Sequence, residues 1–398
     1  MLIGVVGKPS SGKSTFFKAA TMVDVAIANY PFTTISPNRG IGYVKINCVD
    51  KEFGKQCNPR TGWCVNGKRF VPVNLLDVAG LVPDAHKGAG MGLQFMSDLN
   101  QADILIHIID ISGSVNEKGN TVPPLSYDPL NDVEFLEKEL DYWYLDVIKR
   151  GWASFARTVK ATGKEPYKEI AKQLTGLGVT EQVVQEAIKK LKLDQEKMNK
   201  WTEDELLNLA RELRIQTKPM LIAANKIDVE GAEKNYQRLK EKYPDYIVIP
   251  CSGDYEVALR TLGKKAIIDY QPGNSGFKIK DEGKLNQAQK QALEKIKSFL
   301  EKYKSTGVQE ILNTAVFSLL KYKAIFPGGV NNLVDSEGRV LPDCFLMTEK
   351  ATAIDFAFKL HTDFGENFIK AIDVKTKLPV GREHVLKHRD VVEIMSRK

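Results

Sequence analysis

Residues 7–14 read Gly-Lys-Pro-Ser-Ser-Gly-Lys-Ser and directly follow the apolar run Leu2–Val6. The octapeptide matches the pattern G-x-x-x-x-G-K-S/T, whose backbone N–H groups surround phosphate oxygens at the amino terminus of a helix. The apolar run predicts a buried strand of a parallel sheet, and we expect a helix from Lys13. This order of elements predicts an α/β fold of the P-loop nucleoside triphosphatase class, a mostly parallel sheet flanked by helices.

The side chains of this loop suit a triphosphate bound with Mg²⁺. Lys13 is expected to neutralise charge on the β and γ phosphates and to act in catalysis, while the Ser14 hydroxyl supplies an oxygen ligand to Mg²⁺. The glycines let the backbone approach the phosphates closely. The nucleotide-binding residues predicted in this segment are Gly7, Pro9, Ser10, Ser11, Gly12, Lys13, Ser14 and Thr15.

Four further apolar runs predict strands of the same sheet, and a polar residue ends or follows each of them. Open α/β sheets bind ligands at the carboxyl ends of their strands, so we expect these polar residues to gather at one edge. The runs are Val73–Asp77, Ile104–Asp110, Met220–Ala224 and Tyr246–Pro250.

The first of these runs ends in the D-x-x-G pattern Asp77–Gly80. A carboxylate at this place can enter the Mg²⁺ shell, and a glycine N–H can contact the γ phosphate. We therefore predict Asp77 as a metal-site residue and Gly80 as a catalytic residue. The loop that follows, 80–92, is rich in glycine and is expected to rearrange between nucleotide states.

The segment Asn225–Asp228 reads Asn-Lys-Ile-Asp and follows another predicted strand. An aspartate in the N-K-x-D pattern accepts hydrogen bonds from the N1 and N2 donors of guanine, which adenine lacks, so the pattern predicts GTP and GDP over ATP. The base-binding residues expected here and after the last strand are Asn225, Lys226, Asp228, Ser252 and Gly253.

About one hundred residues separate the third and fourth predicted strands, far more than a crossover connection needs. They carry helical periodicity and a capping-box pattern at Thr202 and Glu205, which predicts an inserted α-helical subdomain. After the sheet, residues 286–323 read as two helices broken near Gly307.

The carboxy-terminal segment predicts a small β-grasp domain of ubiquitin-like fold. Pro327-Gly328-Gly329 marks its expected boundary, Thr352 is expected to cap a helix, and strands are expected near 368–372 and 391–395. The predicted domains are 1–114 with 216–275 for the P-loop domain, 115–215 for the helical insertion, 276–324 for a helical linker and 325–398 for the β-grasp domain.

The composition, 43% hydrophobic and 27% charged among 398 residues, excludes a wholly disordered or fibrous chain. No apolar run approaches the roughly 18 residues of a membrane span, so we expect a cytoplasmic location without membrane contact. Five cysteines, an odd number in a long chain, agree with a reducing compartment.

The net charge of +7 comes mainly from one stretch of the chain. Residues 278–323 contain ten lysines against five acidic residues, whereas residues 324–398 contain eleven of each sign. A basic stretch suits a polyanion, and we predict RNA rather than DNA. A solvated lysine-rich helix that only maintains solubility explains the pattern equally well.

Two longer segments around these motifs resemble the switch regions of the Obg-like branch of translation-associated GTPases, which includes Obg, the DRG proteins and YchF. They are residues 30–40, Tyr-Pro-Phe-Thr-Thr-Ile-Ser-Pro-Asn-Arg-Gly, and residues 77–88, Asp-Val-Ala-Gly-Leu-Val-Pro-Asp-Ala-His-Lys-Gly. The insertion is similar to the helical domain of YchF. The positions that resemble a carboxy-terminal TGS domain are Thr352, Ala353, Asp355, Phe356, Ala357, His361, Asp363, Phe368 and Ile369.

The resemblance implies a switch that hydrolyses GTP with Mg²⁺ and acts on the ribosome or RNA. A threonine of the first switch would coordinate Mg²⁺, and alignment favours Thr34 over Thr33. Leu81 stands where a water-positioning glutamine is usual, so another group must orient the attacking water. His86 is the candidate catalytic residue, and the same histidine equally fits a mobile polar loop without a catalytic role.

Two departures from the resemblance are visible. YchF replaces the guanine-reading motif and prefers ATP, whereas Asn225, Lys226 and Asp228 keep the guanine form. Ser10 stands where related loops often carry an asparagine that helps bind K⁺, so no potassium site is assigned. The alternatives are a YchF-like ATPase and a nucleotide-stabilised RNA- or ribosome-binding adaptor with negligible turnover.

An insertion between the two switch segments, residues 51–69, contains Cys57 and Cys64, with Cys48 nearby. Zinc ribbons carry paired short spacings between cysteines, which a single C-x6-C lacks. A hairpin extension with incidental cysteines is therefore the favoured interpretation.

Overall fold

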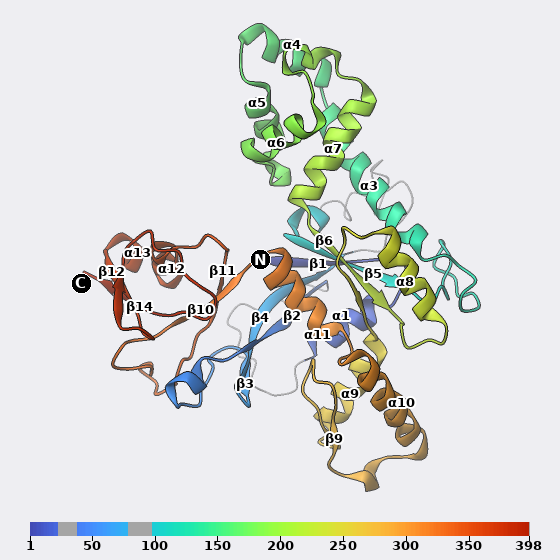
Figure 1. Ribbon diagram of the computed structural model, residues 1–398, viewed down its shortest axis with the longest axis vertical. Helices are drawn as coiled ribbons and strands as arrows, with labels where there is room; N and C mark the ends of the chain where they lie inside the picture. The colour runs from blue at the N-terminus through green and yellow to red at the C-terminus, as the bar shows by residue number, and fades with distance from the viewer. Residues whose placement is uncertain (23–37, 79–97, 398) are drawn as a thin grey trace. The chain divides into compact units, whose positions relative to one another are not determined.

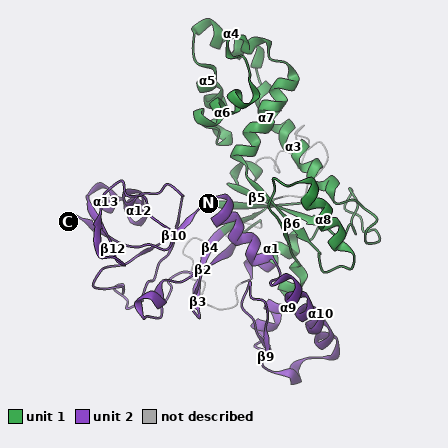
Figure 2. Ribbon diagram, in the orientation of Figure 1, with its two compact units in different colours: residues 1–18, 38–40, 74–257 green, residues 19–37, 41–73, 258–398 purple. Residues whose placement is uncertain are grey.

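The computed structural model describes residues 1–22, 38–78 and 98–397, which form two compact units (Figure 2). The described part of unit 1 consists of residues 1–18, 38–40, 74–78 and 98–257. The described part of unit 2 consists of residues 19–22, 41–73 and 258–397.

The central sheet is built around β1 (Leu2–Val6), which pairs in parallel with β4 (Lys68–Asp77) and with β5 (Ile104–Asp110). β6 (Met220–Asn225) and β7 (Val248–Pro250) continue the sheet in parallel. The strand order is β2-β4-β1-β5-β6-β7. Every residue of β5 is buried, which explains why its sequence is a continuous apolar run rather than an alternation.

The remaining strands of this sheet are β2 (Arg39–Asn47) and β3 (Trp63–Val65), and β3 pairs with β4 in antiparallel direction. The helix predicted from Lys13 is α1 (Lys13–Thr21). Two further helices follow β6 and β7, namely α8 (Ala232–Lys242) and α9 (Gly253–Lys264). The predicted P-loop fold class is confirmed.

The long insertion between β5 and β6 is helical and belongs to unit 1 (Figure 1). Thr202 and Glu205 form the expected capping box at the start of the last of its helices. A buried ion pair of Arg214 with Asp141, 2.9 Å from Nε to Oδ1, joins the first helix to the last. The helices are α3 (Leu130–Lys149), α4 (Trp152–Thr162), α5 (Pro166–Gln173), α6 (Glu181–Leu191) and α7 (Glu203–Thr217).

The basic stretch of unit 2 folds as α10 (Gln287–Tyr303) and α11 (Val308–Asn313), and Thr314–Leu319 continues α11 as a π-helix. The expected break falls at Gly307, whose φ of 85° suits glycine. A short two-stranded sheet, β8 (Ile268–Asp269) with β9 (Lys278–Ile279), precedes these helices.

The carboxy-terminal sheet has the order β11-β10-β14-β12-β13, in which β10 and β14 are parallel and the other neighbours antiparallel. Thr352 caps α12 through a capping box with Asp355, as expected. This is the predicted β-grasp arrangement. Its elements are β10 (Lys323–Pro327), β11 (Phe345–Met347), α12 (Ala353–Leu360), α13 (Thr362–Glu366), β12 (Phe368–Asp373), β13 (Leu378–Val380) and β14 (Val391–Ser396).

The Pro327-Gly328-Gly329 sequence does not mark the start of this domain, since β10 precedes it and its Phe326 is fully buried. The turn residues instead follow the first strand, where the chain must leave the sheet. Among the described residues, no helix is both long and apolar enough to span a membrane.

Candidate nucleotide site

The loop from β1 to α1 depends on two glycines for close backbone packing. A Cβ atom on Gly7 would lie 2.6 Å from the carbonyl oxygen of Ile108, and one on Gly12 would lie 2.2 Å from Asn225 Nδ2. Gly12 also has a φ of 91°, and Ser10 adopts the left-handed region at 62°. A larger residue at either glycine would displace the loop from the neighbouring strands.

The loop borders a cleft of about 470 Å³. Ser14 is exposed in the first turn of α1, where free N–H groups and the helix dipole favour an anion. The lining residues are Lys8, Pro9, Ser10, Gly12, Lys13, Ser14, Thr15, Lys226 and Asp254. Most of the predicted phosphate-binding residues therefore share one cleft.

Lys13, which lines the cleft, forms an ion pair with Asp77 at the end of β4. Their side chains keep 14% and 24% of their surfaces exposed, so solvent reaches both charges. The pair brings the predicted phosphate-binding cation next to the predicted metal-binding carboxylate. Three other predicted residues, Thr34, Gly80 and His86, lie outside the described residues.

Asn225 connects three segments of the site. Its Nδ2 donates to the Ser11 carbonyl oxygen at 3.1 Å, and its Oδ1 accepts from the Gly253 N–H at 3.0 Å. The side chain is buried at the carboxyl end of β6, so these hydrogen bonds are protected from water. The amide thus ties the phosphate loop to the start of α9.

Asp228 lies half-buried after β6 and accepts a hydrogen bond from buried Ser252. Burial raises the pKa of Asp228, and the Ser252 hydrogen bond opposes that shift. Neighbouring Lys226 has a φ of 62° and donates from Nζ to the Ser10 carbonyl oxygen at 3.0 Å. The structure therefore brings the two predicted halves of the nucleotide site together.

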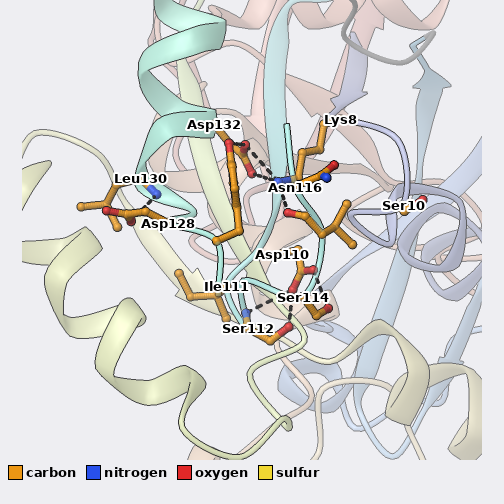
Figure 3. A network of polar contacts seen from close by, with 12 residues as sticks. Lys8, Ser10, Asp110, Ile111, Ser112, Ser114, Asn116, Asp128, Leu130 and Asp132 are labelled. Atoms are coloured by element: carbon orange, nitrogen blue, oxygen red, sulfur yellow. Dashed lines mark hydrogen bonds and ion pairs between the residues drawn. The ribbon is translucent and has the colours of Figure 1, made fainter. Parts of the chain in front are cut away.

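A buried polar network under the phosphate loop was not predicted from the sequence (Figure 3). Lys8 Nζ lies 2.8 Å from Asp132 Oδ2, donates to the Val115 carbonyl oxygen at 2.7 Å, and sits 3.8 Å from the centre of the Tyr127 ring. Tyr127 in turn donates to Asp132 Oδ1 at 2.9 Å. Lys8 occupies a variable position of the loop motif. Its partner Asp132 lies 124 residues away in the sequence, and no residue near Lys8 indicates this pairing.

A second part of the same network surrounds Asp110, the last residue of β5 (Figure 3). Its carboxylate accepts hydrogen bonds from the hydroxyls of Ser112, at 2.5 Å, and of Ser114, at 2.8 Å. Lys226 Nζ lies 3.1 Å from Asp110 Oδ2. The Asp110 carboxylate thus positions Lys226, although the sequence indicated only that Asp110 ends a strand.

His107 lies in the middle of β5 and is fully buried. Neither ring nitrogen has a hydrogen-bond partner in the part of the chain that the structure describes. Burial lowers the pKa of His107 to about 3, and the nearby charge of Lys8 acts in the same direction. The histidine therefore stays neutral beside the buried lysine.

Unit 2 contains a larger cavity, of about 950 Å³, lined by polar and basic residues that include Lys45, Lys68 and His388. It lacks a phosphate-binding loop and the base-reading motif. Lys45 is already engaged, because its Nζ donates to the Pro272 carbonyl oxygen at 2.9 Å and to Asn274 at 2.8 Å. The cleft of unit 1 is therefore the better candidate despite its smaller volume.

Three family models match segments of this chain. Residues 2–137 match the family model of 50S ribosome-binding GTPases, residues 223–330 match the G4 motif-containing domain of YGR210-like Obg-like GTPases, and residues 337–396 match the TGS domain.

Several relatives extend over nearly the whole chain. A GTP-binding protein of Methanocaldococcus jannaschii is 47% identical over 99% of each chain, and one of Schizosaccharomyces pombe is 36% identical over 89% of this chain and 88% of its own. The crystal structure of a GTP-binding protein from Pyrococcus horikoshii has a TM-score of 0.78 and 38% identity and covers both chains completely.

Proposed function

Because this chain belongs to the Obg-like family of P-loop GTPases and carries a TGS domain, we propose that it binds GTP with Mg²⁺ and hydrolyses GTP to GDP and phosphate. The observation that carries the proposal is the position of Asn225, whose side chain bonds both the phosphate loop and the start of α9. Through these two hydrogen bonds, the amide holds the segment Asn225–Asp228, which has the guanine-binding pattern, directly beside the phosphate loop.

Guanine specificity would come from Asp228. Its half-buried carboxylate, supported by Ser252, would accept hydrogen bonds from the guanine N1 and N2 donors. Adenine offers no matching pair of donors and would leave the carboxylate without partners. The N–H of Gly253 and the stem of Lys226 would border the same base.

The metal and catalytic roles concern the other end of the cleft. Ser14, Asp77 and Thr34 would hold Mg²⁺ directly or through water, and Lys13 and the Gly80 N–H would neutralise charge that develops on the γ phosphate. Binding would separate the ion pair of Lys13 with Asp77, because each group gains a stronger partner. His86 would orient the attacking water.

A switch needs a target, and we propose the ribosome or an RNA in the cytoplasm. The matched family model of 50S ribosome-binding GTPases and the lysine-rich stretch 278–323 support such a polyanion. In this proposal, the helical insertion and the TGS domain provide contacts that change with nucleotide state.

Equilibrium titration of the full chain with GTP, GDP and ATP in the presence of Mg²⁺ tests the proposal most directly. GTP and GDP should bind more tightly than ATP, and single-turnover assays should detect slow GTP hydrolysis that ribosomes accelerate. His86→Ala should slow hydrolysis without weakening GTP binding, and an unchanged rate would remove the histidine from the mechanism.

The alternatives give different results in the same assays. Tighter binding of ATP than of GTP would support an ATPase of YchF type and would contradict the role of Asp228. Nucleotide binding without hydrolysis, even with ribosomes present, would support a nucleotide-stabilised adaptor. RNA affinity that does not fall with rising salt would count against a lysine-driven contact.

A further inference from the structure

Three cysteines and one aspartate meet in unit 2, and none of the four is assigned to the nucleotide site. Their ligand atoms all lie within 4.8 Å of one another. Cys48 Sγ lies 3.5 Å from Cys57 Sγ, and Cys64 Sγ lies 3.8 Å from Asp50 Oδ2. We call Cys48, Asp50, Cys57 and Cys64 the cysteine cluster.

The local fold explains how widely spaced residues converge. Cys48 follows β2, Asp50 opens a short 3-10 helix (Asp50–Phe53), and Gly54 ends that helix with a φ of 61°. Cys64 lies in β3, which turns into β4 through Asn66 and Gly67, both at positive φ. The Gly67 carbonyl oxygen accepts from the Cys48 N–H at 2.8 Å and closes the loop.

Asp50 is the strongest sign that this cluster binds a cation. It is 0% exposed, and its oxygens accept from the backbone N–H groups of Lys51 at 2.8 Å and Cys57 at 3.1 Å. No lysine, arginine or histidine of the described residues forms a salt bridge with it. Buried carboxylates are generally paired with a cation or coordinate a metal.

Two of the ligand–ligand distances match those of a tetrahedral site, and the others are at most 4.8 Å. Zinc–sulfur bonds of about 2.3 Å place two thiolates about 3.8 Å apart, and a zinc-bound carboxylate oxygen lies about 3.6 Å from a thiolate. The separations of 3.5 Å and 3.8 Å lie close to these values. We propose that Cys48, Asp50, Cys57 and Cys64 form a closed structural site for a thiophilic divalent cation of the Zn²⁺ class.

A buried guanidinium lies beside the cluster, where it would offset negative charge on thiolate ligands. Arg69 is 1% exposed, and its Nη1 lies 3.7 Å from Cys57 Sγ. Three thiolates and a carboxylate bound to Zn²⁺ carry two net negative charges, and Arg69 offsets one of them.

The cluster holds the part of unit 2 that contacts the carboxy-terminal domain. Arg69 donates to the carbonyl oxygens of Leu341 at 3.0 Å and Pro342 at 2.8 Å. The N–H of Asn58 donates to Val340 at 2.9 Å, and Arg60 Nη2 lies 3.1 Å from Asp335 Oδ2. A metal bound between Cys48 and Cys64 would therefore fix the loop that carries these contacts.

The first experiment determines the occupant of the cluster in the full chain, purified under reducing conditions from zinc-supplemented cells. Elemental analysis should find one zinc per chain, and native mass spectrometry should find a matching mass increase. A metal-free chain that is two hydrogens lighter, with the disulfide located by peptide mapping between two cysteines of the cluster, would overturn the proposal. A metal-free, fully reduced chain that takes up no added Zn²⁺ would do so as well.

Variants then test the ligands. Cys57→Ser and Cys64→Ser should lose stoichiometric zinc, and Asp50→Asn, which keeps one oxygen acceptor, should bind it at least about tenfold more weakly. Cys251→Ser is the matched control, because this buried cysteine lies in unit 1 after β7 and should leave the zinc content unchanged. Equal zinc content in all four variants would contradict the site.

Substitution with Co²⁺ identifies the ligands by their absorption spectrum. Because the absorption is measured per loaded chain, it does not depend on the yield of each variant. Wild-type protein loaded with Co²⁺ should show intense visible absorption of tetrahedral geometry and thiolate charge-transfer bands. Cys64→Ser should reduce the charge-transfer intensity by about a third, because one of three thiolates is removed. Unchanged bands would exclude Cys64 as a ligand.

Discussion

The nucleotide cleft of unit 1 and the cysteine cluster of unit 2 both gather charged side chains, but they differ in exposure to water. In the cleft, Lys13 and Asp77 pair with each other and keep 14% and 24% of their side chains exposed. In the cluster, Asp50 is fully buried and Cys48 and Cys57 nearly so. An open site can exchange its internal ion pair for a ligand, whereas a closed site retains what it binds.

The same contrast recurs within unit 1. The cleft is open, but the Lys8 and Asp132 side chains beneath it are only 6% and 7% exposed. Burial raises the pKa of Asp132 although Lys8 and Tyr127 oppose the shift, so burial of the charge is costly even with its partners present. We therefore expect the exposed Lys13–Asp77 pair to separate when nucleotide binds. The buried Lys8–Asp132 pair is expected to remain intact.

The largest effect is expected at the open site, from Asp228→Asn. Loss of two hydrogen bonds to a charged acceptor, each contributing about 1.5–3 kcal/mol, should weaken GTP binding by about 10²–10⁴-fold. Isothermal titration calorimetry of the variant and the wild type with GTP measures this loss of affinity. Xanthosine triphosphate, with an acceptor at C2 in place of the guanine donor, should bind the variant better than GTP does.

The zinc content of Asp228→Asn should not change. The variant would then show that metal binding in the cysteine cluster does not depend on nucleotide binding in the cleft. A GTP affinity equal to that of the wild type would mean that the aspartate does not read the base.

Asp132→Ala tests the closed pair beneath the cleft. Lys8 would be left buried without its carboxylate partner, and the free energy of unfolding should fall by about 3–5 kcal/mol. Urea denaturation of the full chain measures the change. Asp128→Ala is the control. It removes an ion pair with Arg238, exposed by 40% and 51%, and a hydrogen bond of 3.2 Å from the Leu130 N–H at the start of α3, which together should contribute about 1–2 kcal/mol.

If both aspartate variants lost the same stability, burial would not distinguish the two ion pairs. If Asp132→Ala instead lost only GTP affinity, Lys8 and Asp132 would act mainly on the nucleotide.

The buried His107 predicts a dependence of stability on pH. Its pKa of about 3 in the folded chain lies below the value of 6.5 expected when unfolded. The stabilisation is present above pH 6.5 and is lost as the pH falls toward 3, because the unfolded state binds the proton first. At pH 5 the loss should be about 2 kcal/mol relative to neutral pH.

Denaturation at pH 7.5 and at pH 5 measures this loss in the wild type. His107→Leu should remove most of the dependence, and His384→Gln, at an exposed position, should not. A wild type equally stable at both values would exclude a buried neutral histidine.

The smallest effect is expected at polar contacts that are fully open to solvent. Thr202→Ala removes the capping box of α7 and should cost about 1 kcal/mol in thermal or chemical unfolding. Thr180→Ala removes a single cap bond of 3.4 Å on α6 and should cost less. If Thr180→Ala lowered the free energy of unfolding more than Thr202→Ala, the number and length of the capping hydrogen bonds would not predict their contribution to stability.

Much of the fold and half of the candidate site followed from contiguous motifs. The strand, loop and helix around Gly12 and the segment at Asn225 were predictable because each motif lies within a few residues of a buried strand. The partner of Lys8 was not predictable, since Asp132 is 124 residues away and looks like an ordinary acid in the first turn of a helix.

The cysteine cluster shows the same limit more sharply. The spacing of Cys57 and Cys64 argued against a metal, yet the structure gathers both with Cys48 and Asp50. The hairpin of β3 and β4 brings Cys64 opposite Arg69, and the 3-10 helix turns Asp50 toward them. Spacing rules for zinc ribbons did not anticipate this combination of a helix and a hairpin.

The sequence by itself determined the P-loop class, the helical insertion and the guanine form of the base-reading segment, because local backbone geometry requires those residues at that spacing. Only the tertiary structure decided which charges are buried and with whom they pair. The Lys8–Asp132 pair and the cysteine cluster both depend on packing between segments far apart in the chain. Long-range packing controls solvent access, and solvent access controls whether a charged group exchanges its partner or keeps it.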